Sequence, residues 1–196
     1  MHGLTARALE SFVRNTYGEK TWANIAWASG LQEEGFELML AYPPELTDRV
    51  LAEAAIHLAR TREEVLEDLG TFLVSHPRMQ PLRRLFRYGG ADFRGFLESL
   101  GDLPERARLA LPHAVLPPLS ATEEERGRWS VECGHTTFGL VHVLLGAIRA
   151  MADDYGALAV AQIVPSPEAG SDRIEIEILA GQFAEGRHFE LKLSAE

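Results

Sequence analysis

The stretch from Gly90 to Pro118 constrains the fold most, because a helical pattern ends there in a rigid proline exit. Its apolar residues recur at three- and four-residue spacing, which predicts a helical face turned toward a core. These residues are Phe93, Phe96, Leu97, Leu100 and Leu103. Asp102 predicts a helix start, since Glu105 follows it in a capping-box pattern. The chain then leaves through Pro117-Pro118, which disfavours helix. We therefore expect this stretch to join two different halves.

The sequence before this joint is helical in pattern, and the sequence after it mixes helix and strand. Before the joint, the clearest helix start is the capping box at Thr61. Beyond it, a helix is predicted at 141–155 and strands at 129–133, 158–164, 173–179 and 187–193. The predicted fold class is α+β, an N-terminal helical bundle packed on a C-terminal antiparallel sheet with one long helix. We expect a single domain over residues 1–196, made of a helical subdomain (1–89), the joint (90–118) and an α/β subdomain (119–196).

Charge and composition exclude several classes of function. A formal net charge of -10 argues against binding to nucleic acid or to an anionic membrane surface. Because Cys133 is the only cysteine, no intrachain disulfide and no cysteine-rich metal site can form. No apolar run approaches the roughly 20 residues of a membrane helix, and no signal peptide precedes the first amphipathic pattern. We expect a cytoplasmic protein.

No arrangement of side chains in the sequence predicts catalysis. Asp153 and Asp154 are adjacent, so on a helix they point in different directions. The run Glu123–Glu125 is predicted to be a solvated charge run. A basic cluster is likewise predicted to form a solvated face: Arg83, Arg84 and Arg87. With no glycine-rich phosphate loop either, we expect that the protein is not an enzyme.

Several short stretches occur in a specific order along nearly the whole chain. They are MHGL at 1–4 with Ala8-Leu9, NTYG at 15–18 with Trp22, QEEG at 32–35, VLE at 65–67 with Leu69-Gly70, Gly90 with Phe96-Leu97 and Leu100, the proline pair, and Gly139-Leu140 with Gly146. Together they resemble the heme-nitric oxide/oxygen binding family (H-NOX, also called HNOB), which includes the sensor domain of soluble guanylate cyclase. The resemblance implies the fold predicted above and a sensory role in signal transduction.

The resemblance also locates the family's heme site, whose ligating residues are not retained here. In the family, the iron is held by a histidine on the joint helix, eight residues before the proline that matches Pro112. The matching residue is Pro104, which has no side-chain donor atom. A Tyr-x-Ser-x-Arg motif anchors the propionates in the family, and Cys133, His135 and Thr137 stand at its three positions. Threonine cannot replace the bidentate hydrogen bonds of arginine. The resemblance implies these pocket positions: Pro104, Cys133, His135, Thr137, Thr5 and Pro117.

Two replacements for the lost ligand remain as alternatives. His113 lies nearest in sequence to Pro104, although it falls beyond the predicted helix. Cys133 and His135, two apart on a predicted strand, would share a face and could bind a soft metal. A closed zinc site needs four protein ligands, however, so the competing interpretation is a packed thiol beside a hydrogen-bonded histidine. His113 and His135 are the candidate metal ligands.

We therefore expect an H-NOX-like sensory domain that is degenerate for standard heme ligation and has no cofactor. It would bind another ligand or a protein partner. The alternative is a heme b protein that senses nitric oxide or a related gas through non-standard iron ligation. Because stand-alone bacterial members of the family usually act on a histidine kinase or a cyclic-dinucleotide enzyme, the resemblance implies a signalling partner of that kind. It also implies that a change at the joint helix rotates the helical half against the sheet half.

Overall fold

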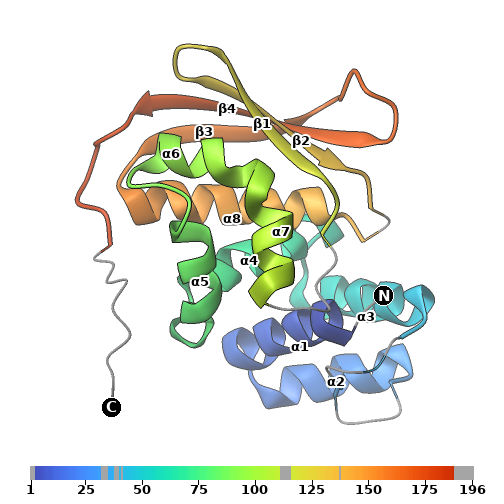
Figure 1. Cartoon of the computed structure of the whole chain (residues 1–196). Helices are drawn as coiled ribbons and strands as arrows, with labels where there is room; N and C mark the ends of the chain where they lie inside the picture. The colour runs from blue at the N-terminus through green and yellow to red at the C-terminus, as the bar shows by residue number, and fades with distance from the viewer. Residues whose placement is uncertain are drawn as a thin grey trace.

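The fold is described from a computed structural model, which places residues 3–31, 35–37, 40, 42–110, 116–136 and 138–187 (Figure 1). The N-terminal half is helical, as predicted. Its elements are α1 (Gly3–Tyr17), α2 (Glu19–Ser29), α3 (Pro44–Leu58), α4 (Arg62–Ser75), the 3-10 helix η1 (Pro77–Met79) and α5 (Gln80–Arg87). The capping box that opens α4 is confirmed, because Glu64 N donates to Thr61 Oγ1 at 3.1 Å and Thr61 N donates to Glu64 Oε2 at 2.8 Å.

The joint consists of three short helical pieces. They are α6 (Phe93–Glu98), the 3-10 helix η2 (Ser99–Asp102) and α7 (Leu103–Ala110). Asp92 caps α6, since Gly95 N donates to its Oδ1 at 2.8 Å. The predicted break is confirmed, because α7 begins directly after Asp102. The five apolar residues of the predicted stripe are all buried, which confirms that the joint faces a core. The predicted end of α7 near Pro112 lies outside the described residues.

The C-terminal half carries an antiparallel sheet and one long helix, which confirms the α+β class. The elements are β1 (Leu119–Glu125), β2 (Arg128–Gly134), α8 (Leu140–Tyr155), β3 (Leu158–Val164) and β4 (Ser171–Ala180), and the strand order is β1-β2-β4-β3. The acidic run 123–125, predicted to be solvated, ends β1, where Glu123 pairs with Trp129 and where Glu124 and Glu125 are exposed. The predicted strand at 187–193 falls outside the described residues except for Arg187, which belongs to no strand.

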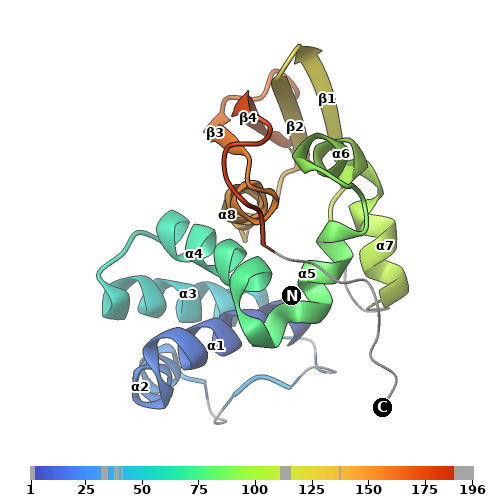
Figure 2. The same cartoon turned by 90° about the vertical axis from the view of Figure 1, so that its left-hand side faces the viewer.

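The molecule is layered, with the sheet above α8 and α6 and the remaining helices below them (Figures 1 and 2). Two apolar cores follow from this arrangement. The first lies between the sheet, α8 and the joint, and contains Trp129, Val131, Ile148 and Ile176. The second lies among α1, α2, α3 and α4. None of the described helices combines the length and apolar character that a bilayer span requires.

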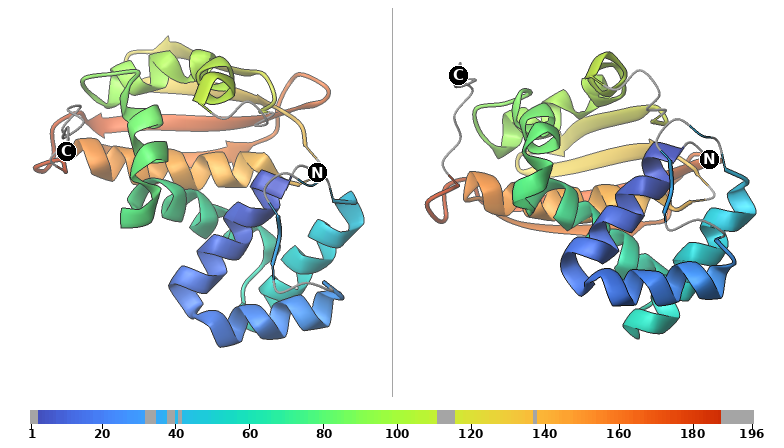
Figure 3. Two further views of the ribbon diagram at one scale, coloured as in Figure 1. Left: turned by 60° about the horizontal axis from the view of Figure 1, so that its bottom comes forward. Right: turned by 90° about the horizontal axis from the view of Figure 1, so that it is seen from below.

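Helices α4 and α8 connect the two cores and lie against each other in both views of Figure 3. Their backbones approach closely, since a Cβ atom added at Gly146 would stand 1.9 Å from the carbonyl oxygen of Glu67. At the edge of this contact, Arg149 of α8 donates to Glu67 Oε2 at 2.7 Å. The same guanidinium donates to the carbonyl oxygen of Ala161 on β3 at 2.8 Å. One side chain therefore ties α4, α8 and the sheet together.

Candidate functional site

Pro104 occupies the second position of α7, the helix of the joint. A proline fits the first turn of a helix, because its fixed φ suits the helix and its missing N–H would have no intrahelical partner. Its neighbours Leu103 and Ala107 are buried, and Leu103 belongs to the same apolar core as Cys133. This part of α7 is therefore built for packing, and Pro104 offers no atom to a metal.

Cys133 lies near the end of β2 with its side chain fully buried. Its thiol donates to the carbonyl oxygen of Gly134, with Sγ 3.6 Å away. Burial, with a smaller contribution from Asp172, raises the pKa of this thiol to about 11. A metal or a heme iron binds the thiolate, so the surroundings of Cys133 favour the form that does not bind.

His135 lies beyond the end of β2 and is exposed. Its Nδ1 is 3.1 Å from Asp172 Oδ2, and its backbone N–H donates to Gly170 O at 2.9 Å. Cys133 and His135 have different surroundings, because the thiol is fully buried and the imidazole is exposed. Within the described ranges, no group of three or more His, Cys, Asp or Glu side chains could hold a metal ion.

The remaining predicted positions are only partly described. Pro117 is half-buried and packs beside the end of β2, where a Cβ atom added at Gly134 would lie 3.1 Å from Pro117 Cβ. The structure thus brings Pro117 close to the Cys133 strand. Thr5 lies in α1, but its side chain is outside the described part, as are Thr137 and His113 altogether.

The donor set of the described residues does not fit a heme held in the family manner. Pro104 has no donor atom, Cys133 is a buried neutral thiol, and the imidazole of His135 faces an aspartate. Buried carboxylates such as propionates need cationic partners, since an unpaired buried charge is costly. No described residue at the matching positions carries a permanent positive charge.

A buried ion-pair cluster at the C-terminal end of α8 escaped the sequence interpretation. Asp154 is 1% exposed, and its Oδ1 lies 2.7 Å from Arg83 Nη2 while its Oδ2 lies 3.2 Å from Arg87 Nη1. The predicted solvated basic face was therefore wrong for Arg83 and Arg87, because both point inward to this carboxylate, whereas Arg84 is exposed. The helical spacing carried a signal, since Asp154 follows the buried Met151 by three residues and so falls on the apolar face of α8.

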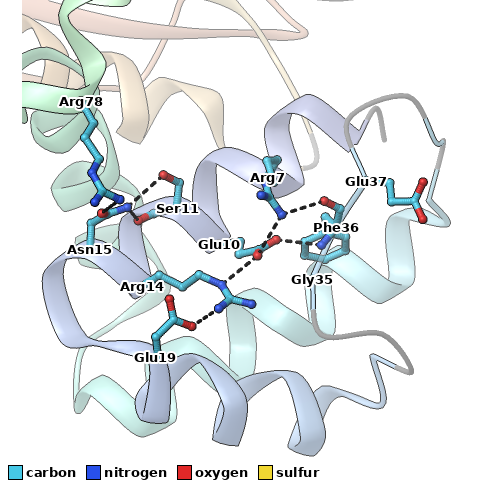
Figure 4. Close-up of a pocket in the computed structure, with 10 residues that line it drawn as sticks. All are labelled: Arg7, Glu10, Ser11, Arg14, Asn15, Glu19, Gly35, Phe36, Glu37 and Arg78. Atoms are coloured by element: carbon cyan, nitrogen blue, oxygen red, sulfur yellow. Dashed lines mark hydrogen bonds and ion pairs between the residues drawn. The ribbon is translucent and has the colours of Figure 1, made fainter.

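A second cluster forms a polar hollow of about 580 Å³ beside α1 (Figure 4). At its base Glu10, 1% exposed, accepts hydrogen bonds from Arg7 Nη1 at 3.1 Å, Arg14 Nε at 2.8 Å and Phe36 N at 2.7 Å. Arg78 at the rim donates to Asn15 Oδ1 at 2.8 Å. These donors already bond to groups of the chain, so the polar cluster mainly fixes Phe36 to α1. The polar lining of the hollow does not suit an apolar ligand.

Comparisons with known proteins agree with the fold described above. The family model "Haem-NO-binding" matches residues 2–161. The soluble guanylate cyclases gcy-31 and gcy-32 of Caenorhabditis elegans are 21% and 24% identical over 154 and 159 residues, which cover 79% and 78% of this chain. The chain spans only 22% and 23% of the length of those two relatives.

Solved structures show the same fold at low sequence identity. An H-NOX protein from S. oneidensis in the Fe(II)NO ligation state has a TM-score of 0.74 at 14% identity, covering 91% of this chain and 99% of its own. The Fe(II) unliganded H-NOX protein from K. algicida has a TM-score of 0.72 at 16% identity, covering 97% of this chain and 100% of its own.

Proposed function

Because the chain belongs to the haem-NO-binding (H-NOX) family, we propose that it is a sensory domain that regulates a signalling partner without standard heme ligation. The observation that carries this proposal is Pro104, which stands in the first turn of α7 where the resemblance expects the iron-ligating histidine. A proline there stabilises the helix start and supplies no ligand. The domain itself would carry no catalysis.

The surroundings of the other matching positions support the same proposal. The thiol of Cys133 is held neutral by burial, and the imidazole of His135 pairs with Asp172 at the surface. Such a domain would respond to another ligand or directly to a protein partner. From the family, the partner would be a histidine kinase or a cyclic-dinucleotide enzyme, and its signal would pass through the joint between the two halves.

One observation favours the second candidate, a heme b sensor of nitric oxide or a related gas with non-standard ligation. The fold matches an H-NOX protein solved in an Fe(II)NO state over 91% of this chain. In that case the iron ligand would have to come from outside the matching position, and His113 is the nearest histidine in sequence.

An absorption spectrum decides between the two candidates. The full chain is produced with ample heme, and the spectrum of the reduced protein is recorded before and after nitric oxide is added. We expect no stoichiometric Soret band from a protein with a folded far-ultraviolet signal, because Pro104 offers no side-chain donor at the position of the family's iron ligand. A stoichiometric band that shifts with nitric oxide would overturn the proposal and favour the second candidate.

A pair of variants tests the role of position 104 itself. Pro104→His supplies an imidazole donor, and Pro104→Ala is the matched control that also removes the proline ring. If the lost donor limits heme binding, Pro104→His binds more heme than Pro104→Ala at equal helix content. Equal binding by both variants would show that the donor at position 104 is not what limits heme binding.

A further inference from the structure

The last turn of α8 contacts three segments that are distant in sequence. Arg83 and Arg87 reach the carboxylate of Asp154 from α5. Tyr155 donates its hydroxyl to the carbonyl oxygen of Gly90, at the start of the joint, at 2.9 Å. Figure 1 shows α5 and the red segment after β4 meeting the same end of α8.

That red segment, residues 181–187, is fixed to α8 by backbone hydrogen bonds. Phe183 N and Ala184 N donate to the carbonyl oxygen of Gly156 at 2.8 and 3.1 Å, and Arg187 N donates to that of Asp154 at 2.9 Å. The fit is close, since Gly156 has a φ of +73° and an added Cβ atom would lie 2.1 Å from Ala184 O. The segment therefore depends on the conformation of residues 154–156.

Asp154 connects the two sides of this turn. Its carboxylate accepts from Arg83 and Arg87 of α5, while its carbonyl oxygen accepts from Arg87 Nη1 at 3.2 Å and from Arg187 N. Arg87 also stacks on Tyr155, with its Cζ 3.9 Å from the ring centroid. Moving either guanidinium away from this buried carboxylate is costly, because the buried charge then loses a partner. The positions of Arg83, Arg87 and Asp154 are therefore coupled.

We propose that Asp154, Tyr155, Arg83 and Arg87 form a lock that couples the joint to the C-terminal segment 181–187. A displacement of α5 or of Gly90 then moves the last turn of α8, and with it the amides of Phe183, Ala184 and Arg187. The lock needs no ligand at the joint, so it goes beyond the proposed function. It provides a route by which the state of the joint reaches residues outside both cores.

Amide hydrogen exchange of the full chain, measured by mass spectrometry, tests the coupling. Asp154→Asn removes the charge and keeps the shape of the side chain. The neighbouring exposed Asp153, changed to Asn, is the matched control. We expect Asp154→Asn to speed exchange on the order of tenfold or more both in residues 83–90 and in 181–187. The control stays unchanged, as do α1, α2 and α3 in both variants.

A second variant keeps the test decisive if Asp154→Asn does not fold. Tyr155→Phe removes only the hydroxyl bonded to Gly90 and leaves the ring under Arg87. It should speed exchange near Gly90 and, less strongly, at Phe183 and Ala184. In either variant, faster exchange near the joint with unchanged exchange in residues 181–187 would contradict the proposed coupling. Hydrogen exchange does not depend on heme. The lock can therefore be refuted while the absorption spectrum supports the proposed function, and the proposed function can be refuted while the lock holds.

Discussion

Two polar side chains, Asp154 and Cys133, sit in the apolar core of the C-terminal half, and each is stabilised differently. The carboxylate of Asp154 is contacted by two guanidinium groups. Cys133 is held in the neutral thiol form, because burial raises its pKa to about 11. At the scale of single residues, a buried polar side chain in this core is either paired with opposite charges or kept in its neutral form, because an unpaired buried charge is costly.

The raised pKa of Cys133 predicts slow alkylation. At pH 7.5 the thiol is almost entirely protonated, and the thiolate is the reactive form. The rate of reaction with iodoacetamide in the folded protein should therefore rise about tenfold for each pH unit until about pH 11. The rate is followed by mass spectrometry, with the same protein in concentrated urea as the control. Equal rates in the folded and the unfolded protein at pH 7.5 would contradict the assignment.

At the scale of elements, local signals predicted most of the helices. The capping box at Thr61 and the apolar stripe of the joint both specify their helices from within a few residues. Thr61→Ala removes the acceptor for Glu64 N and should cost about 1 kcal/mol in the free energy of unfolding. For a chain of this size the melting temperature would fall by about 2–4 °C. Thr61→Ser, which keeps the oxygen, should melt close to the wild type, and an equal loss in both variants would refute the cap.

Strand β1 shows where local signals fail. Its inward residues Leu119 and Ala121 are only partly buried, and its end is the acidic run Glu123–Glu125. The strand forms because β2 offers backbone partners along it, interrupted only between Glu123 and Glu125, and no pattern within residues 119–125 reveals this. The partner of the arginines in α5 was hidden for a similar reason, since Asp154 lies 71 residues beyond Arg83. The sequence therefore predicted the fold class, but not these long-range pairings.

For the whole molecule, the two raised pKa values predict a loss of stability at high pH. Burial raises the pKa of Tyr155 to about 12 and that of Cys133 to about 11, from their ordinary values of 10.0 and 9.0. The folded state thus holds these protons more tightly than the unfolded state. Their contribution is complete below about pH 9 and is lost as the pH rises through 11 and 12.

Urea unfolding at pH 7.5 and at pH 10.5 checks this expectation. The midpoint should fall at the higher pH, and the fall should be smaller in the double variant Cys133→Ala, Tyr155→Phe. Both changes lower stability at every pH, so the comparison uses the difference between the two pH values for each protein. A midpoint difference that is the same in both proteins would assign the alkaline loss to other groups.

The guanidinium of Arg149, which ties α4 and α8 to β3, also determines how far the sheet can extend. Among the described strands, β3 is one edge of the sheet, and its seven residues carry no charge, which is the type of edge that recruits a strand from another molecule. Arg149 places a charged side chain on the Ala161 carbonyl of that edge. The opposite edge, β1, ends in three consecutive charged side chains, Glu123–Glu125, and charged side chains on an edge strand discourage strand addition. Both borders are thus protected against strand addition, a safeguard against aggregation that involves no residue of the heme-site positions.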